Sequence, residues 1–287
     1  MNARCSLCAV LVSPLFLGTT IFSAAAISAP IVFSAEKATE SEWNGLKKLD
    51  FKVDGRSALL IVPEKPLPGN PWIWRTEFFG AFPAADIALA KLGVYVGYIN
   101  MQDMYGASPS IDIMNAYYKH VVREYKLSRK PVLEGFSRGG LFAFNWAAKN
   151  PQKVSGIYVD APVCDFRSWP GGKGKGKGSP GDWDKLCKIY KMTPDQAMKS
   201  KEAPIDNLAP IAKAKIPILA VVGDADEIVP VEENTAIVEE RYKKLGGVIK
   251  VIHKPGVGHH PHSLQDPSPI VEFVLKVTGN EKSIPVT

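Results

Sequence analysis

Along the chain, short apolar runs alternate with segments in which apolar residues recur every three to four positions. The short runs are rich in β-branched and aromatic residues and predict buried strands, whereas the longer spacing predicts amphipathic helices. The helical spacing is clearest for Ile111, Met114, Tyr118, Val121 and Tyr125. The pattern predicts strands over residues 46–53, 57–62, 71–75, 94–99, 131–133, 154–159, 216–222 and 248–253, and helices over 83–92, 111–125, 141–148, 231–245 and 270–277.

The order of these elements predicts an α/β protein. Two strands around the turn Asp54-Gly55 come first, and strand–helix units follow them without an internal repeat. Strands that are joined through helices run parallel, and the helices cover both faces of the sheet. The part of the chain after residue 35 has the length of one such domain. We therefore expect one domain over residues 36–287, built on a mostly parallel central sheet.

Residues 1–35 differ from the rest of the chain. They contain one charged residue, Arg4, and most residues between Cys8 and Phe33 are apolar. An early cation, an apolar stretch and small residues after it are typical of a secretory signal peptide. An uncleaved membrane anchor is the alternative, but Pro14 and Gly18 interrupt the stretch. We expect a signal peptide over residues 1–35, a secreted or periplasmic protein, and no stable membrane contact after cleavage.

Charge and cysteine content add little that is specific. The formal net charge is +6, and Arg4 supplies one of these charges, so we expect no nucleic-acid partner. Two cysteines, Cys164 and Cys187, lie beyond residue 35, and their pattern fits no zinc site. In an exported chain we expect them to form a disulfide, with two separate buried thiols as the alternative. We expect no cofactor.

The run Gly135-Phe136-Ser137-Arg138-Gly139 is the first candidate for chemistry. It lies between the predicted strand 131–133 and the predicted helix 141–148. A G-x-S-x-G in this setting is the nucleophile elbow of the α/β-hydrolases, a sharp turn that exposes the serine Oγ above the sheet. Its glycines are small because the strand and the helix approach closely there. A glycine-rich turn that only packs a helix is the alternative.

A serine hydroxyl needs a base to become a good nucleophile. The predicted strand 216–222 is followed by Gly223-Asp224-Ala225-Asp226-Glu227-Ile228-Val229-Pro230, and the predicted strand 248–253 by Gly256-Val257-Gly258-His259-His260-Pro261-His262. The α/β-hydrolases have their acid and their histidine at such strand ends, in this order after the serine. From Leu46 to the C-terminus the chain therefore resembles the α/β-hydrolase superfamily. The resemblance implies the α/β-hydrolase fold, with helices on both faces of the sheet and a small lid insertion.

The resemblance assigns Asp226 as the acid that orients the histidine and stabilises the imidazolium. It lies three residues after Gly223, where similar hydrolases have this aspartate. Asp224 is an alternative, although an aspartate there more often bonds the backbone of the turn. Asp160, after the strand 154–159, is a second alternative because some members of the superfamily use that position.

The identity of the catalytic histidine is also left open, because three histidines follow the last predicted strand within four residues of one another. The G-x-G-H match gives His259 the catalytic position and makes His260 the aromatic residue that commonly follows it. His262 is two residues further along. The adjacent pair and Pro261 lack the i, i+4 spacing of two ligands on one helix, so we expect no metal site.

An oxyanion hole needs two backbone N–H groups directed at the developing charge. One is expected from Arg138, directly after the serine, and the other from Glu77 or Phe78 in the loop after the strand 71–75. The Arg138 side chain is expected either to bind a substrate carboxylate or to pair with an acid such as Glu134. Arg75 and Glu77 are expected to pair with each other if they only hold the loop.

The segment 165–210 departs from the strand–helix rhythm. It follows the sixth strand of the core, where hydrolases insert a lid, and it includes the glycine–lysine tract 171–178. We expect this tract to be a mobile surface loop. Its lysines, Lys173, Lys175 and Lys177, either attract anionic substrates or are only solvated. Side chains at the carboxyl ends of the strands and in this lid are the candidates for substrate binding: Phe79, Asp103, Tyr105 and Trp169.

These expectations together predict a secreted serine hydrolase that cleaves a carboxylic ester through an acyl-enzyme. The expected substrate is a small-molecule or carbohydrate ester, which rests on analogy alone. A serine peptidase resembling the prolyl-oligopeptidase group is the first alternative. A non-catalytic binding protein with the hydrolase fold is the second, although such proteins usually lack one member of the triad.

Overall fold

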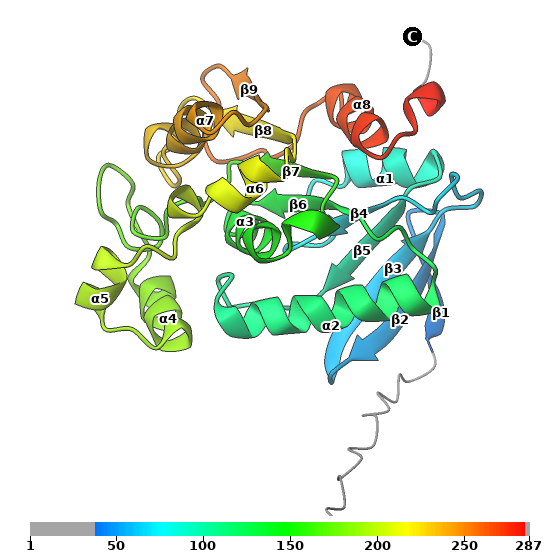
Figure 1. Cartoon of the computed structure of the whole chain (residues 1–287), viewed down its shortest axis with the longest axis horizontal. Coiled ribbons are helices and arrows are strands. Elements are labelled where there is room, and N and C mark those ends of the chain that lie inside the picture. Colours follow the sequence, from blue (N-terminus) through cyan, green and yellow to red (C-terminus); the bar gives the residue numbers. More distant parts are fainter. Residues whose placement is uncertain (1–37, 285–287) are drawn as a thin grey trace, which may run out of the picture. The chain divides into compact units, whose positions relative to one another are not determined.

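In the computed structural model, which describes residues 38–284, a nine-stranded sheet crosses the molecule with strand order β1-β2-β3-β5-β4-β6-β7-β8-β9 (Figure 1). The pairings β1/β2, β2/β3 and β3/β5 are antiparallel, and the other five are parallel. The described strands are β1 (Thr39–Trp43), β2 (Leu46–Val53), β3 (Arg56–Val62), β4 (Trp72–Arg75), β5 (Tyr95–Ile99), β6 (Val132–Phe136), β7 (Gly156–Asp160), β8 (Ile218–Gly223) and β9 (Ile249–Lys254).

Helices cover both faces of this sheet because successive strand residues point to opposite sides. On β4, the buried Trp72 and Trp74 pack into one apolar core and Ile73 packs into the other. The first core lies under α2 (Ser108–Glu124), α3 (Gly139–Lys149) and α7 (Thr235–Lys244), and the second lies under α1 (Ala84–Lys91) and α8 (Ser268–Val277) (Figure 1). The predicted α/β-hydrolase fold, with a mostly parallel sheet between two helical layers, is therefore confirmed.

The segment between β7 and β8 contains helices that the sequence pattern did not predict. They are α4 (Pro180–Tyr190), α5 (Pro194–Lys199) and α6 (Ala209–Lys213). At the start of α5, Thr193 and Gln196 form reciprocal side-chain-to-backbone hydrogen bonds, which stabilise its first turn. That this segment acts as a lid stays a prediction.

The glycine–lysine tract lies against the segment that follows β8. The Nζ of Lys175 is 2.8 Å from Glu232, and the Nζ of Lys177 is 3.0 Å from Glu227. Gly176 is buried, and a methyl group in place of its hydrogen would lie 3.0 Å from the Pro230 ring. Two of the three lysines thus have acidic partners of their own, which weakens the expectation that they attract anionic substrates.

The predicted disulfide is wrong. Cys164 and Cys187 are both buried and both free. Cys164 follows β7 in the core, and its backbone N–H donates to the side-chain oxygen of Asn234 at 2.9 Å. Burial raises the pKa of both thiols, because it disfavours the thiolate. The two cysteines therefore pack as small apolar side chains.

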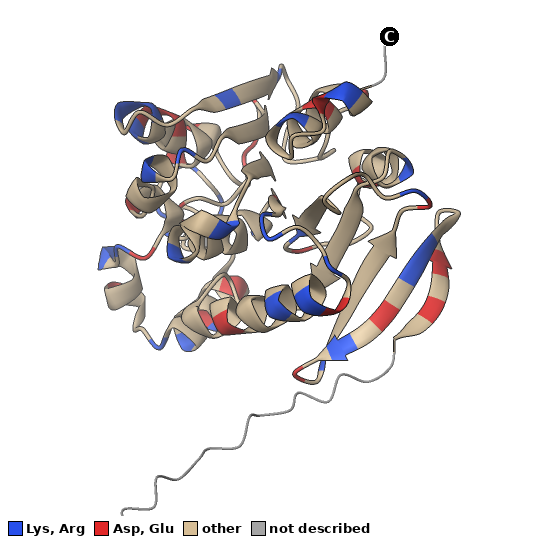
Figure 2. Cartoon of the chain, turned by 45° about the vertical axis from the view of Figure 1, so that its right-hand side comes forward, with Lys and Arg blue, Asp and Glu red and all other residues tan. Residues whose placement is uncertain are grey.

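Charged residues of both signs are interspersed over the outer strands and the helices (Figure 2). On the β1–β2 hairpin, for example, Lys48 lies 3.2 Å from Asp50. Within residues 38–284, no helix has the length and apolarity needed to cross a bilayer. The expected signal peptide, residues 1–35, lies outside the described residues.

Candidate active site

Ser137 occupies the sharp turn between β6 and α3, as the sequence predicted. Its φ angle is +49°, in the left-handed region that non-glycine residues rarely adopt. Its N–H donates to the backbone oxygen of Asp160 at 2.9 Å, and its carbonyl accepts from Val163 N–H at 2.8 Å. A methyl group on Gly135 would lie 2.8 Å from the Gly139 backbone, so only glycine permits this approach of strand and helix. The turn therefore holds the Ser137 side chain at the carboxyl end of the sheet.

A chain of hydrogen bonds leads from Ser137 to Asp226. The Ser137 Oγ lies 2.9 Å from the His259 Nε2, and the His259 Nδ1 lies 2.7 Å from the Asp226 Oδ2. The other carboxylate oxygen of Asp226 accepts the N–H groups of Ile228 and Val229 at 2.9 and 2.8 Å. Because an ionised carboxylate only accepts, His259 Nδ1 carries the hydrogen and Nε2 accepts from the serine.

Close packing of two strand ends brings His259 and Asp226 together. The turn after β8 and the loop after β9 are joined by the hydrogen bond from Ala225 N–H to Val257 O at 2.9 Å. A methyl group on Gly223 would lie 2.3 Å from the Gly258 oxygen. Asp226 and His259 are 6% and 8% exposed, so their hydrogen bond is shielded from water.

The two alternative acids pair with other histidines. Asp224 Oδ1 lies 2.6 Å from the Nδ1 of His253, in an exposed pair on the outside of β8 and β9. Asp160 Oδ1 lies 2.8 Å from the Nδ1 of His262, and this pair is buried. Of the three candidate acids, Asp226 alone has a partner that also bonds Ser137.

The three predicted oxyanion donors come from the residue after Ser137 and from the loop after β4. Among residues 38–284, the N–H groups of Arg138, Glu77 and Phe78 donate no hydrogen bond to a protein atom. The Glu77 nitrogen is 3.8 Å from the place of a methyl group on Gly139, so the loop after β4 packs against the start of α3. These donors are thus available to a ligand at Ser137.

The Arg138 side chain is the centre of a cluster of acidic residues. Its Nη2 is 2.9 Å from Glu77 Oε1, and its Nη1 is 3.3 Å from Asp103 Oδ1 and 3.6 Å from Asp182 Oδ1. The guanidinium also lies over the Phe78 ring, 5.2 Å from its centre. Burial raises the pKa of Glu77 to about 7 although Arg138 opposes the shift. The cluster joins the elbow to the loops after β4 and β5 and to α4.

Arg138 therefore pairs with acids, as one expectation had it, but the partners named for the two arginines were wrong. Arg75 bonds Asp86 at 2.5 Å and Glu134 at 3.3 Å, and not Glu77. Arg75 and Glu134 are partners in the register of β4 and β6, so their side chains extend from the same face of the sheet. Arg138 lies beyond β6 and meets Glu77 instead. Burial, together with the nearby Asp86, raises the pKa of Glu134 well above its usual value.

The predicted substrate-binding residues are scattered. Asp103 pairs with Arg138 and, at 2.9 Å, with Lys185, close to the elbow. Tyr105 is completely buried, and its hydroxyl donates to Asp182 at 2.5 Å. Phe79 packs between Trp43 and Tyr98, with ring centres 5.1 and 5.6 Å away. Trp169 packs against the core under α2 and α3. Of these four, Asp103 forms an ion pair with Arg138, and the Tyr105 ring lies 5.5 Å from the Arg138 guanidinium.

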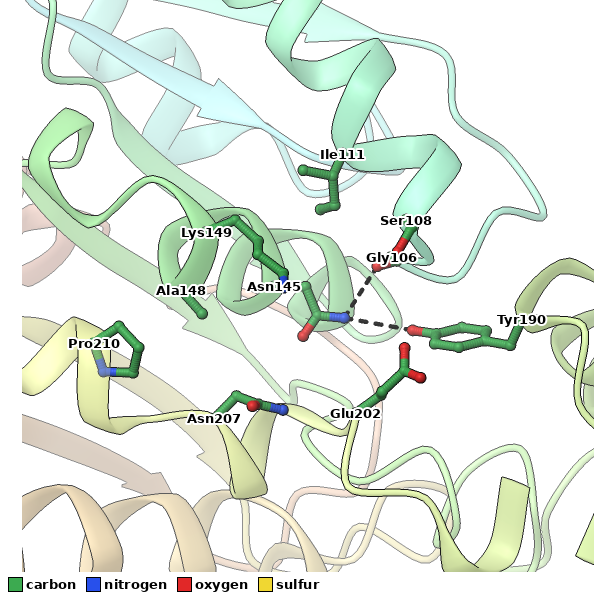
Figure 3. Close-up of a pocket in the computed structure, with 10 residues that line it drawn as sticks. All are labelled: Gly106, Ser108, Ile111, Asn145, Ala148, Lys149, Tyr190, Glu202, Asn207 and Pro210. Atoms are coloured by element: carbon green, nitrogen blue, oxygen red, sulfur yellow. Dashed lines mark hydrogen bonds between the residues drawn. The ribbon is translucent and has the colours of Figure 1, made fainter. Parts of the chain in front are cut away.

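A cavity of about 210 Å³ lies between α3, the start of α2 and the segment after α4 (Figure 3). Asn145 points into it and donates to the Gly106 carbonyl at 3.0 Å and to the Tyr190 hydroxyl at 3.4 Å. Its lining contains none of Ser137, His259 and Asp226: Gly106, Ser108, Ile111, Asn145, Ala148, Lys149, Tyr190, Glu202, Asn207 and Pro210. This cavity is therefore separate from the site around Ser137.

Sequence reasoning missed the contribution of α4. Asp182 in its first turn accepts hydrogen bonds from Tyr105 and Ser179 and approaches Arg138. Ser179-Pro180 followed by an acidic residue is a helix-start pattern that could have indicated α4. Nothing in the local pattern links Asp182 to a residue 44 positions earlier in the chain.

Solved structures share this fold at low sequence identity. A puromycin-hydrolyzing peptidase of Mycobacterium tuberculosis is 12% identical with a TM-score of 0.64, over 84% of this chain and 40% of that one. Dipeptidyl peptidase 4 of Porphyromonas gingivalis is 13% identical with a TM-score of 0.61, over 84% and 36%. An S-formylglutathione hydrolase of Agrobacterium tumefaciens is 13% identical with a TM-score of 0.56, over 87% and 100%.

This chain spans about 40% of the length of the first of these peptidases. Among curated proteins, none matches the chain. A family model does match it, over residues 98–280, and that model describes the prolyl oligopeptidase family. The matched region runs from β5 to the end of α8 and includes Ser137, Asp226 and His259. The chain therefore belongs to the prolyl oligopeptidase family, a family of serine hydrolases with the α/β-hydrolase fold.

Proposed function

We propose that this protein hydrolyses a carboxylic ester by acyl transfer, with Ser137 as nucleophile, His259 as general base and acid, and Asp226 as the group that orients the imidazole. The observation that carries the proposal is the unbroken hydrogen-bond chain from Ser137 Oγ through His259 to Asp226, at 2.9 and 2.7 Å. A serine and a histidine within hydrogen-bond reach, with a third group behind the histidine, are the requirements for nucleophilic catalysis.

The proposed reaction has two halves. Ser137 Oγ attacks the ester carbon while its proton passes to His259 Nε2, and the resulting oxyanion accepts hydrogen bonds from Arg138 N–H and from Glu77 or Phe78 N–H. The tetrahedral intermediate collapses, and the leaving alkoxide takes the proton from Nε2 and departs as an alcohol. Water then attacks the acyl-enzyme by the same route, which releases the acid and restores Ser137.

The ester preference is supported by the match to the S-formylglutathione hydrolase, which covers the whole of that enzyme. A hydrolase of an S-acyl compound thus uses this fold at this size. We propose a small-molecule or carbohydrate ester as the substrate. We also propose that residues 1–35 are a signal peptide, that the enzyme is secreted or periplasmic, and that residues 165–210 form a lid over the site.

A peptidase is the second candidate, because the family match and two of the named structures favour it. The same three residues would then acylate on a peptide carbonyl, with the amine taking the proton from His259. The two candidates differ in the leaving group and share the acyl-enzyme.

Labelling with a fluorophosphonate tests the shared mechanism. The purified protein is expected to react at Ser137, and Ser137→Ala is expected not to react. A folded wild-type protein that stays unlabelled would favour the non-catalytic binding protein. Rates on p-nitrophenyl esters and on peptide p-nitroanilides then separate the candidates. A higher kcat/KM on the anilides would replace the esterase proposal with the peptidase.

A further inference from the structure

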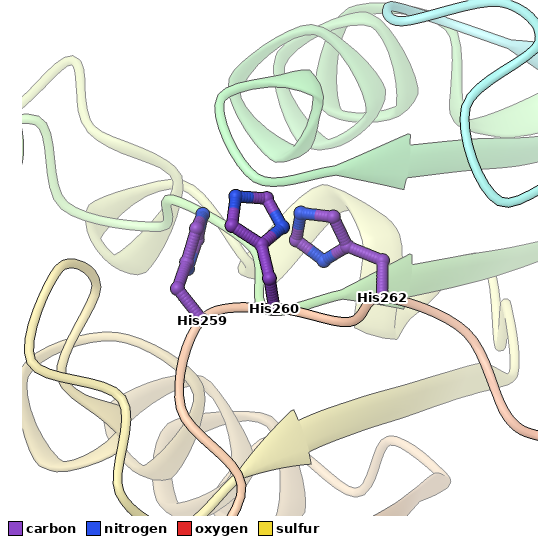
Figure 4. Close-up of side chains that lie close together, drawn as sticks. All are labelled: His259, His260 and His262. Carbon is purple, nitrogen blue, oxygen red and sulfur yellow. The ribbon is translucent and has the colours of Figure 1, made fainter.

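The loop between β9 and α8 brings three imidazole rings together beside Ser137. His259, His260 and His262 each offer a ring nitrogen, and these nitrogens lie within 4.8 Å of one another. Figure 4 shows the rings side by side on this loop, with the ring of His262 turned toward His260. We infer that the three histidines form a binding site for Zn²⁺, and that the bound ion inhibits the enzyme. The inhibition rests on the proposed function, whereas the metal site does not.

The spacing of the rings suits a single metal ion. The ring centres of His259 and His260 are 4.9 Å apart, those of His259 and His262 are 4.9 Å apart, and those of His260 and His262 are 4.7 Å apart. A ring whose nitrogen lies about 2.0 Å from zinc has its centre about 3.2 Å from the ion, so two rings at a tetrahedral angle have centres about 5 Å apart. The three imidazoles therefore already have nearly the separation that coordination requires.

Two of the rings are oriented by carboxylates as zinc ligands usually are. The Nδ1 of His259 faces Asp226 at 2.7 Å, and the Nδ1 of His262 faces Asp160 at 2.8 Å. In each neutral ring the hydrogen is on Nδ1, so the lone pair is on Nε2 and is available to a metal. Histidines that bind zinc typically donate their other ring N–H to such a carboxylate. The two buried aspartates also supply negative charge near the site.

The loop is held in place from several sides, and it is open to solvent at one ring. Lys254 Nζ donates to the Pro261 and Ser263 carbonyls at 2.6 and 3.2 Å, and its charge lies 4.0 Å from Asp160. The Phe82 ring lies 5.9 Å from the ring of His260, centre to centre. His260 is exposed, so an ion can reach the site from water.

Zinc at this position would compete with the proposed catalysis directly. Its bond to His259 Nε2 would use the lone pair that accepts the Ser137 proton across 2.9 Å. A zinc-bound nitrogen accepts no proton, so Ser137 would lose its base while the ion stays. The inhibition is expected to be reversed when EDTA removes the ion.

Equilibrium dialysis of EDTA-treated protein against ZnCl₂ tests the site without any need for activity. We expect one Zn²⁺ per chain and an affinity that falls about 10-fold or more in His260→Gln. The matched control is His253→Gln, which removes another exposed histidine with a carboxylate partner, and its affinity should equal that of the wild type. Absence of saturable binding, or equal affinity in His260→Gln and wild type, would overturn the inference.

The inhibitory effect is read from the rate of fluorophosphonate labelling at Ser137, as the ratio with and without saturating zinc in the same protein. In the wild type we expect zinc to slow the labelling by about 10-fold or more, and EDTA to restore the labelling rate. An unchanged rate in zinc-loaded protein would refute the inhibition. If the zinc-free protein is not labelled at all, the proposed hydrolase fails, and the dialysis still decides whether the metal site exists.

Discussion

Two buried histidine–aspartate pairs lie at neighbouring strand ends and are almost alike in geometry. His259 meets Asp226 after β8 at 2.7 Å, and His262 meets Asp160 after β7 at 2.8 Å. The difference is what each histidine meets with its other nitrogen. His259 Nε2 reaches Ser137, whereas His262 is bonded to no hydroxyl within the described residues. In the proposed mechanism, the contact with Ser137 gives the His259–Asp226 pair its catalytic role, and the His262–Asp160 pair lacks such a contact within the described residues.

The two pairs also differ in the backbone N–H groups that their carboxylates accept. Asp226 accepts the N–H groups of its own turn, through Ile228 and Val229. Asp160 accepts Ser263 N–H at 2.8 Å from the histidine loop, so it fastens that loop to the sheet. We infer that Asp226 orients one ring for chemistry and that Asp160 anchors the segment that carries both rings.

Replacing each of the two histidines by alanine should give the largest difference in activity between the two pairs. His259→Ala is expected to lower kcat/KM by about 10⁴-fold or more, as Ser137→Ala does, because members of a triad act as a unit. His262→Ala leaves the hydrogen bond between Ser137 and His259 in place and should cost far less. Ester hydrolysis by variants whose circular dichroism matches the wild type is the measurement. An active His259→Ala with an inactive His262→Ala would transfer the catalytic role to His262.

Replacement of the two acids should divide function from stability. Asp226→Asn is expected to lower kcat by about 10⁴-fold, since an amide favours the wrong tautomer of His259. Asp160→Asn should reduce activity much less and lower the free energy of unfolding by about 3 kcal/mol, because it weakens a buried charged acceptor of three hydrogen bonds.

Urea unfolding and steady-state kinetics on both variants check this division. The two measurements must rank the variants in opposite orders. A stability loss in Asp226→Asn together with a dead but stable Asp160→Asn would reverse the assignment.

The sequence was sufficient for the parts of the site that depend on local backbone. At Gly135 and Gly140 beside Ser137, and at Gly223 at the end of β8, a Cβ would lie only 2.3 to 2.8 Å from a neighbouring atom, so these positions require glycine. Such constraints leave a pattern in the chain, and the elbow and the two strand-end turns were predicted from it.

Contacts between distant segments were missed where no family motif marked them. Glu77, Asp103 and Asp182 meet Arg138 from three separate segments, and no spacing along the chain records that meeting. β1 was missed because its residues are polar and exposed, so it shows no apolar alternation. The short helices after β7 were missed for a similar reason, since α5 and α6 span only 6 and 5 residues.

The proposed zinc site departs from the expectation, drawn from the sequence, of no metal. A metal site was not expected because the three histidines lack helical spacing. A loop can nevertheless close the distance between rings that a helix would not.

A third acid near Ser137 has an arginine partner in place of a histidine and should titrate differently. Burial raises the pKa of Glu77 from its usual 4.5 to about 7, against the opposing effect of Arg138. The folded state therefore holds the proton more tightly than the unfolded state, and stability falls as the pH rises from about 4.5 to about 7. The total change is about 3 kcal/mol.

Glu77→Gln removes this titration, so the variant serves as the reference for the wild type. The difference in unfolding free energy between wild type and variant, measured in urea at several pH values between 4.5 and 8, should shift in favour of the variant as the pH rises. A difference that is constant across this range would show that Glu77 titrates normally in the folded protein.

The smallest effect is expected at the exposed pair of Asp224 and His253, which resembles the buried pairs in distance alone. Their oxygen and nitrogen are 2.6 Å apart, but the side chains are 41% and 50% exposed, so water competes for both. Asp224→Asn should therefore change stability by less than about 1 kcal/mol and leave kcat/KM close to that of the wild type. Asp224 and Asp226 are only two residues apart on one turn. The same Asp→Asn substitution at both positions therefore compares an exposed acid with a buried acid that is connected to Ser137, at nearly the same place in the chain. A loss of activity in Asp224→Asn as large as that in Asp226→Asn would mean that the hydrogen-bond chain through His259 does not identify the acid.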